Sequence, residues 1–149
     1  MIEAAGSGFL IAVLWMDLIF DVQVLPHRRS AELPEPVLAS IAGYYRRATT
    51  TSRPMSLLIA AVMVVLLAAL TFHAVDGADP RWLTAMFALL AGGPVLLAVL
   101  RTVPNAVALG ARTASPAQQT RLARAICRDH LLCLTSMSIF LVLWLVTAA

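Results

Sequence analysis

The stretch that decides the fold class is residues 55–73, MSLLIAAVMVVLLAALTFH, an almost purely aliphatic run with no charged residue before its terminal histidine. A helix needs about 20 such residues to cross the hydrocarbon core of a bilayer. The whole chain of 149 residues is 60% hydrophobic and only 13% charged, whereas soluble domains carry about 25% charged residues. Because a helix is the only unit that can cross a membrane alone in so short a chain, these features predict an all-α integral membrane protein.

Three more apolar segments have spanning length, so we expect a four-helix bundle that forms one transmembrane domain over residues 1–149. The predicted spans are about 4–25, 55–73, 81–103 and 126–147. Asp79-Pro80 predicts a capped start for the third helix, and Gly92-Gly93-Pro94 predicts a kink within it. Ser115-Pro116-Ala117-Gln118 predicts a capping box. With no helix breaker from there to Ala149, the fourth helix is expected to be long.

The distribution of arginine predicts the orientation in the membrane. Ten of the eleven basic residues, all of them arginine, lie in or beside the first and third loops, and only Arg81 adjoins the second. The positive-inside rule places loops one and three in the cytoplasm. We therefore expect a bacterial plasma-membrane protein with both termini outside, in contact with anionic inner-leaflet lipids through Arg121, Arg124 and Arg128.

Within the first loop, residues 35–48 have the apolar spacing of a short amphipathic helix. Val37, Ile41, Tyr44 and Tyr45 recur near helical spacing. We expect this helix to lie on the inner membrane surface, with its tyrosines at headgroup level.

Two carboxylates in the first span are the polar residues that most need partners. Asp17 and Asp21 are four residues apart and share a helix face, and a carboxylate within a span costs roughly 3 kcal/mol on insertion scales. All four spans bring polar candidates to the same end, which predicts a polar pocket open to the cytoplasm: His27, Arg53, Arg101, Asn105, Arg128, Asp129 and His130. The alternative is that Arg–Asp pairs between helices only hold the helices together.

Three chemistries fit such a pocket. Asp17, Asp21, His130 and His27 offer oxygen and nitrogen ligands for a transition metal. Asp17, Asp21 and His130 also suit acid–base catalysis, because histidine titrates near neutrality. The third chemistry is recognition of an anionic or quinone-like substrate by Arg101, Asn105 and Arg128.

The layout resembles the anthrone-oxygenase-like family of small four-helix membrane proteins. The matching pieces are Arg101-Thr102-Val103-Pro104-Asn105 after the third span and the segment from Arg124 to His130 at the start of the fourth. The family typically has an aromatic residue in the second piece, where this chain has Arg128-Asp129-His130. The resemblance implies an oxidase or oxygenase that acts on a hydrophobic aromatic substrate within the membrane.

The sequence therefore favours a membrane-embedded oxidoreductase with a polar pocket at its cytoplasmic end. Two alternatives stay open: a non-catalytic subunit or assembly factor of a membrane complex, and a small proton-coupled transporter in which Asp17 or Asp21 carries the proton. We expect a homo-oligomer or a subunit of a larger complex, and no nucleic-acid partner.

Overall fold

The computed structural model describes residues 1–77 and 79–147, and helices make up nearly all of this part of the chain, with no strand in it. Four helices are long and apolar enough to cross a membrane: Ile2–His27, Arg53–Asp76, Arg81–Ala111 and Pro116–Thr147. The predicted all-α class and the four apolar helices are confirmed; the first three helices extend beyond their predicted spans, and the fourth begins where the long helix was predicted to begin. Ala78 in the second loop and residues 148–149, which the prediction assigned to the last helix, lie outside the described residues.

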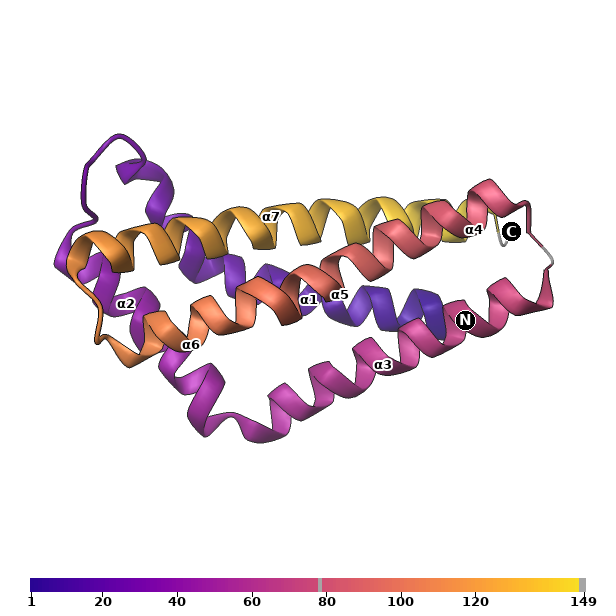
Figure 1. The fold of residues 1–149 in the computed structure, drawn as a ribbon, viewed down its shortest axis with the longest axis horizontal. Helices are drawn as coiled ribbons and strands as arrows, with labels where there is room; N and C mark the ends of the chain where they lie inside the picture. The colour runs from indigo at the N-terminus through magenta and orange to yellow at the C-terminus, as the bar shows by residue number, and fades with distance from the viewer. Residues whose placement is uncertain (78, 148–149) are drawn as a thin grey trace.

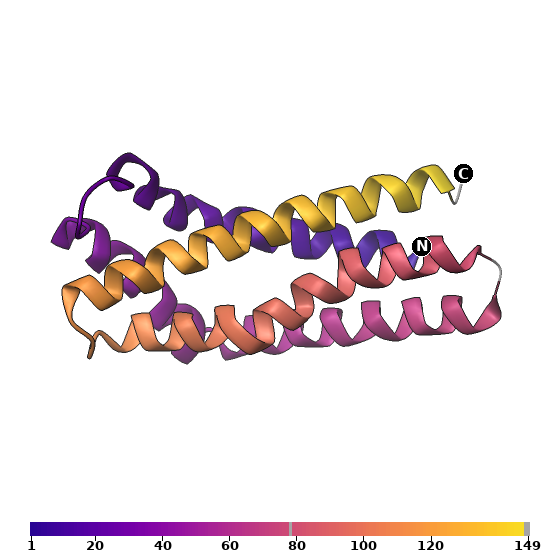
Figure 2. The same cartoon turned by 45° about the horizontal axis from the view of Figure 1, so that its top comes forward.

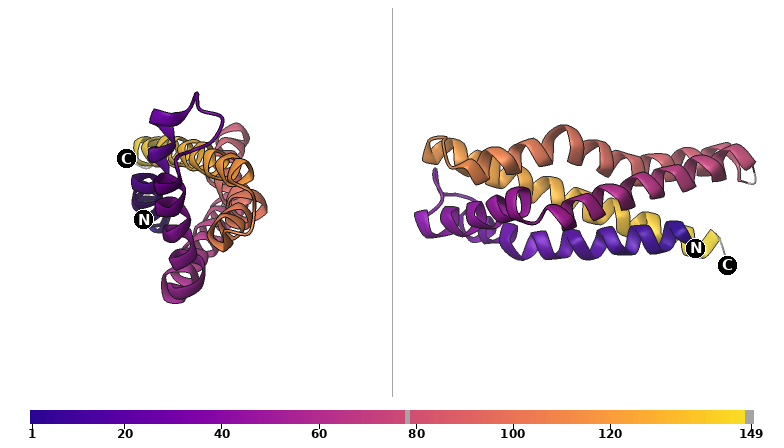
Figure 3. Two further views of the ribbon diagram at one scale, coloured as in Figure 1. Left: turned by 90° about the vertical axis from the view of Figure 1, so that its left-hand side faces the viewer. Right: turned by 90° about the horizontal axis from the view of Figure 1, so that it is seen from below.

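The four long helices run along the longest axis of the molecule (Figure 1). The N-terminus, the connection from α3 (Arg53–Asp76) to α4 (Arg81–Phe87) and the last turn of α7 (Pro116–Thr147) lie at one end. At the other end lie α2 (Glu35–Arg46) and residues 112–115 between α6 (Val103–Ala111) and α7. We call the second of these the α2 end. Helix α1 (Ile2–Asp21) packs against α7 (Figure 3), whereas α3 lies at the edge of the molecule and diverges from α1 toward the α2 end (Figure 1).

The helix of the first span and the short helix in the loop after it are each longer than predicted from the sequence. Helix α1 continues as a 3-10 segment, η1 (Val22–His27), and α2 continues as a π-helical turn, η2 (Arg47–Thr51). The predicted short helix is therefore present, but it packs against α6 and buries Leu38, Ile41 and Tyr45. Tyr45 is only 4% exposed, so it faces the protein interior, and the placement of the helix and its tyrosines at headgroup level stays a prediction.

The third span is one irregular helical path that includes two π-helical turns. It comprises α4, η3 (Ala88–Gly92), α5 (Gly93–Leu97), η4 (Ala98–Thr102) and α6. Each π turn ends two residues before a proline, Pro94 or Pro104. A proline lacks the N–H for the ladder and its ring crowds the preceding turn, and a π turn accommodates both effects. The path bends near α5 (Figure 2), and the helix continues through Pro104 and Asn105, beyond the end of the span predicted near residue 103.

The helix starts show one correct and one wrong capping prediction. The backbone N–H of Ser115 donates to Gln118 Oε1 at 3.1 Å and the N–H of Gln118 lies 3.4 Å from Ser115 Oγ, which confirms the capping box at the start of α7. At the start of α4 the cap residue is Pro80, not Asp79. The carboxylate of Asp79 instead contacts His73 Nε2 at 2.6 Å.

The core consists of two apolar clusters with polar residues between them. One cluster lies at the α2 end and joins α2, α6 and the first turns of α7 through residues such as Ile41, Leu109 and Ile126. The other fills the opposite half of the molecule, where Phe87, Phe140 and Trp144 pack with ring centroids 5.1–5.8 Å apart. Asp17, Asp21 and His130 lie between these clusters along α1 and α7.

Candidate functional site

The structure brings together the three residues that the sequence predicted to be catalytic. Asp17 and Asp21 are four residues apart on α1, and both face α7, where His130 lies between them. The imidazole Nδ1 of His130 is 2.6 Å from Asp21 Oδ2, a hydrogen bond, and its Nε2 is 3.8 Å from Asp17 Oδ2. A histidine between two carboxylates inside a spanning helix pair is the central feature of the site.

Two tyrosines from α2 complete this group. The hydroxyl of Tyr44 donates to Asp17 Oδ1 at 2.5 Å, and that of Tyr45 donates to Asp21 Oδ1 at 2.6 Å. The Tyr45 oxygen also lies 3.4 Å from His130 Nδ1. We call Asp17, Asp21, Tyr44, Tyr45 and His130 the acid–histidine cluster.

The two tyrosines were missed as site residues, although the sequence contained a signal for them. Two carboxylates in a span need hydrogen-bond donors, and Tyr44 and Tyr45 are the only tyrosines of the chain. They occur on the apolar side of the predicted short helix, next to Ile41, so a buried position was open to them. Burial, followed by contact with Asp17 and Asp21, raises the pKa of both tyrosines above the ordinary value, and they therefore stay hydrogen-bond donors.

The side chains of the cluster differ in exposure, and the side of the cluster where Asp17 lies is the more accessible one. The side chain of Asp21 is 0% exposed, that of His130 9%, and that of Asp17 19%. Phe20 stacks on Tyr44 beside Asp17, with ring centroids 4.2 Å apart. The two residues that precede Asp17 on α1, Trp15 and Met16, are exposed apolar side chains. Asp17 is therefore the most exposed of the three candidate catalytic residues Asp17, Asp21 and His130.

The predicted substrate-binding arginines have a different partner. Arg101 Nε lies 3.1 Å from Asp129 Oδ2, and Arg128 Nε lies 3.6 Å from Asp129 Oδ1. Within residues 1–77 and 79–147, no hydrogen bond or ion pair joins either arginine to the acid–histidine cluster. Asn105, the third predicted binder, is half-buried on α6. A substrate-binding role for these three residues stays a prediction.

His27 does not join the cluster as the predicted metal set required. It follows Asp21 by six residues, which is on the order of 10 Å along the helix, and its backbone carbonyl accepts a hydrogen bond from Arg124 Nη2 at 2.9 Å. No group of three or more His, Cys, Asp or Glu side chains in the described part of the chain is placed to hold a metal ion. Asp21, Tyr45 and His130 instead form one hydrogen-bonded group, and beside it Asp17 accepts a hydrogen bond from Tyr44 and lies 3.8 Å from His130.

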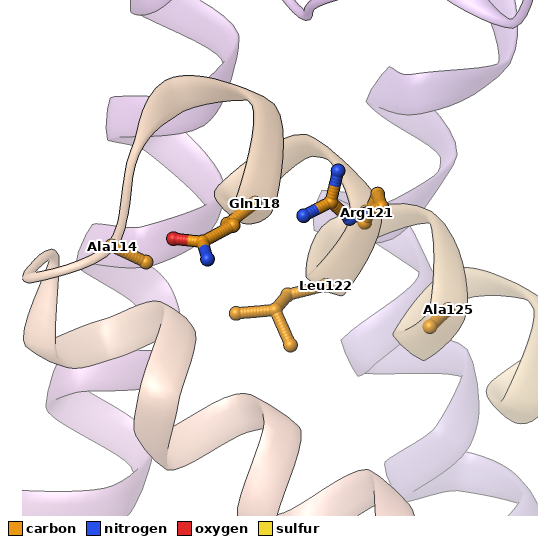
Figure 4. Close-up of a pocket in the computed structure, with 5 residues that line it drawn as sticks. All are labelled: Ala114, Gln118, Arg121, Leu122 and Ala125. Atoms are coloured by element: carbon orange, nitrogen blue, oxygen red, sulfur yellow. The ribbon is translucent and has the colours of Figure 1, made fainter.

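Two surface hollows occur near the α2 end, and neither is lined by the acid–histidine cluster. One lies at the start of α7, where Leu122 and Gln118 face an open space in front of α6 (Figure 4). The other lies between α2 and α6 and includes Arg46 and Gly110. The polar pocket predicted from the sequence therefore does not coincide with either hollow.

No family model matches the chain, and comparisons with curated proteins and with solved structures also found no match. The resemblance to the anthrone-oxygenase-like family stays a prediction. Any function assigned to this chain therefore rests on the geometry of the site.

Proposed function

We propose that this chain is an integral membrane protein in which His130 acts as a general base and acid for an oxidoreductase reaction on a hydrophobic substrate. The observation that supports this proposal is the position of His130 between Asp21, which is fully buried, and Asp17, which is partly open. Ionisable residues inside a span are costly, and they commonly mark proton relays and substrate paths.

Each member of the cluster has a separate role in this proposal. Asp21 is a positioning residue: it holds Nδ1 of His130 and receives the Tyr45 hydroxyl, so it orients the ring and stabilises the imidazolium form. His130 Nε2 is then directed toward the accessible side, where Asp17 lies. An O–H or acidic C–H bond of the substrate breaks there, the proton passes to Nε2, and the electron pair stays on the substrate.

The oxidoreductase part of the proposal derives from the family resemblance. An anion formed by loss of that proton is easier to oxidise, and an oxidase or oxygenase uses dioxygen as the electron acceptor. Exposed Trp15 and Met16 next to Asp17 suit a substrate that arrives through the bilayer. The substrate class is therefore a hydrophobic phenol, quinol or related aromatic compound.

The acid–histidine cluster is one-sided, which argues against a transport path through a single chain. The half of the molecule opposite the α2 end is filled by an apolar cluster that includes Phe87, Met137 and Phe140, each at most 2% exposed. A proton would have to cross this region without a titratable carrier. We infer from the ten-to-one arginine distribution that the α2 end faces the cytoplasm and that both termini lie outside.

The proposal is tested by oxygen uptake with the full-length protein in lipid nanodiscs and a panel of hydrophobic phenols, quinols and anthrones. We expect His130→Gln to lower the rate by about 100-fold or more, which is the usual contribution of a general base. His73→Gln is the matched control, because His73 lies at the opposite end and contacts Asp79. Equal rates for the two variants would remove His130 from the reaction, and no uptake by the unmodified protein with any substrate would remove the oxidoreductase assignment.

A specific observation also favours the second candidate, a subunit or assembly factor that packs against another protein. Only 6% of the apolar window of α3 is buried, compared with 22–28% in the other three spanning helices. A partner subunit or a second copy of the chain would cover this face. The mass of the purified particle in detergent tests this candidate, since a strictly monomeric particle with full oxygen uptake contradicts it.

A further inference from the structure

A second charged group lies on the surface of the molecule, separate from the acid–histidine cluster. Asp129 is 1% exposed, and both of its carboxylate oxygens lack a well-aligned hydrogen bond within the described residues. Its charge is balanced by Arg101 from η4 and Arg128 from α7, each of which presents Nε to it. The buried carboxylate thus fixes two arginines from different helices beside each other.

The outer parts of both guanidinium groups remain available. The side chains of Arg101 and Arg128 are 45% and 60% exposed, and neither guanidinium donates a hydrogen bond to a residue in the described ranges. Two arginines and one aspartate leave a net charge of about +1 at this place. Paired guanidinium forks are suited to the oxygens of a phosphate.

The surroundings indicate which phosphate would bind. Leu132 lies one turn beyond Arg128 on the same face of α7, and Leu100 adjoins Arg101; they are 56% and 68% exposed. Exposed leucines on one side of paired arginines mark the level at which acyl chains meet headgroups. Toward the α2 end, Arg121 is seven residues before Arg128 on the same face, and it lines the hollow drawn in Figure 4.

We propose that Arg101 and Arg128, held by Asp129, bind the phosphodiester of an anionic phospholipid. The acyl chains lie along the exposed leucines, and the headgroup extends toward the hollow at Gln118 and Arg121. This site differs from the basic stripe that the sequence predicted to meet anionic lipid, which consists of Arg121, Arg124 and Arg128. Arg124, a member of that stripe, is turned away and donates to the carbonyls of His27 and Ser30 at 2.9 and 2.7 Å, whereas Arg101 was not a member.

The test is native mass spectrometry of the full-length protein in detergent with added phosphatidylglycerol or phosphatidylcholine. We expect phosphatidylglycerol to bind more tightly, and the double variant Arg101→Gln, Arg128→Gln to bind it roughly 100-fold more weakly or worse, because each arginine loses charge-assisted hydrogen bonds to the phosphodiester in addition to its charge. Arg53→Gln is the control, since Arg53 is exposed and is the first residue of α3, whose start lies toward the α2 end in Figure 1. The affinity of this variant is expected to fall by no more than about fivefold, the diffuse contribution of one arginine near an anionic surface. Equal loss in both variants would show a diffuse charge effect and overturn the proposal.

Two further measurements distinguish a built site from simple attraction. Arg101→Lys with Arg128→Lys keeps the charge but removes the planar forks, so we expect at least a fivefold loss, and unchanged affinity contradicts the proposal. Inorganic phosphate is the second probe. If it displaces the lipid at equal concentration, the site binds free phosphate and the lipid assignment is wrong; if the lipid stays bound, the acyl contacts contribute as proposed.

Discussion

Gly110 is the residue at which α6 meets α2, and substitution by alanine tests how the acid–histidine cluster is positioned. A Cβ atom at this glycine would lie 2.9 Å from the backbone nitrogen of Arg46, 3.1 Å from its Cα and 3.2 Å from the carbonyl carbon of Tyr45. All three are backbone atoms, so no side-chain rotation relieves the contact. Normal contacts between carbon atoms are about 3.5–4.0 Å, and α2 would have to move by roughly half an ångström.

The expected cost follows from these distances. Overpacking of this kind destabilises proteins by about 1–3 kcal/mol, and replacing a helical glycine by alanine regains about 0.5–1 kcal/mol. The midpoints of these two ranges leave a net loss of about 1 kcal/mol, which lowers the melting temperature by roughly 2–5 °C for a chain of this length. Because α2 carries Tyr44 and Tyr45, the same shift lengthens their hydrogen bonds to Asp17 and Asp21 and lets the tyrosines ionise at lower pH.

Two measurements in detergent check this expectation for Gly110→Ala: thermal unfolding, and the ultraviolet absorbance of tyrosinate as a function of pH. Gly8→Ala is the control, because a Cβ at Gly8 has no atom within 4 Å and the variant should be as stable as the unmodified protein or slightly more so. If Gly110→Ala matched Gly8→Ala in melting temperature and left the tyrosine titration unchanged, the close approach of α2 and α6 would not position the cluster.

Three further predictions concern local features. The only tyrosines are Tyr44 and Tyr45, and both have raised pKa values, so tyrosinate absorbance should be absent at pH ~10, where free tyrosine is half ionised. The folded state binds these protons more tightly than the unfolded state, so the free energy of unfolding falls as the pH rises above ~10. A normal tyrosine titration would contradict burial of the two hydroxyls. Ser115→Ala removes the cap of α7 and should cost about 1 kcal/mol in thermal unfolding, whereas Ser52→Ala, at a helix start without a side-chain cap, should cost less. Arg124→Gln loses two hydrogen bonds to the loop after α1, so tryptic cleavage of that loop should become faster, and an unchanged rate would show that this arginine does not hold the loop.

The sequence predicted the elements well because helix formation and burial depend on local pattern. An apolar run of spanning length has only one stable form in a bilayer, and the capping box at Ser115 and Gln118 needs residues only three apart. The spacing of Asp17 and Asp21 likewise placed both carboxylates on one helix face before any partner was known. The error at Asp79 has a physical reason too, because His73, in the preceding helix, competes for its carboxylate.

The partners of the charged residues were decided only by the tertiary structure. Tyr45 reaches Asp21 across 24 residues of chain, and His130 reaches it across 109. Which arginine meets which aspartate depends on helix rotation and on the π turn that delivers Arg101 to Asp129. The inward position of α2 depends on a glycine in α6 that lets two backbones touch. By itself the sequence thus determined the helices and the residues in need of partners, whereas packing between distant segments selected those partners, because no local pattern specifies contacts between distant segments.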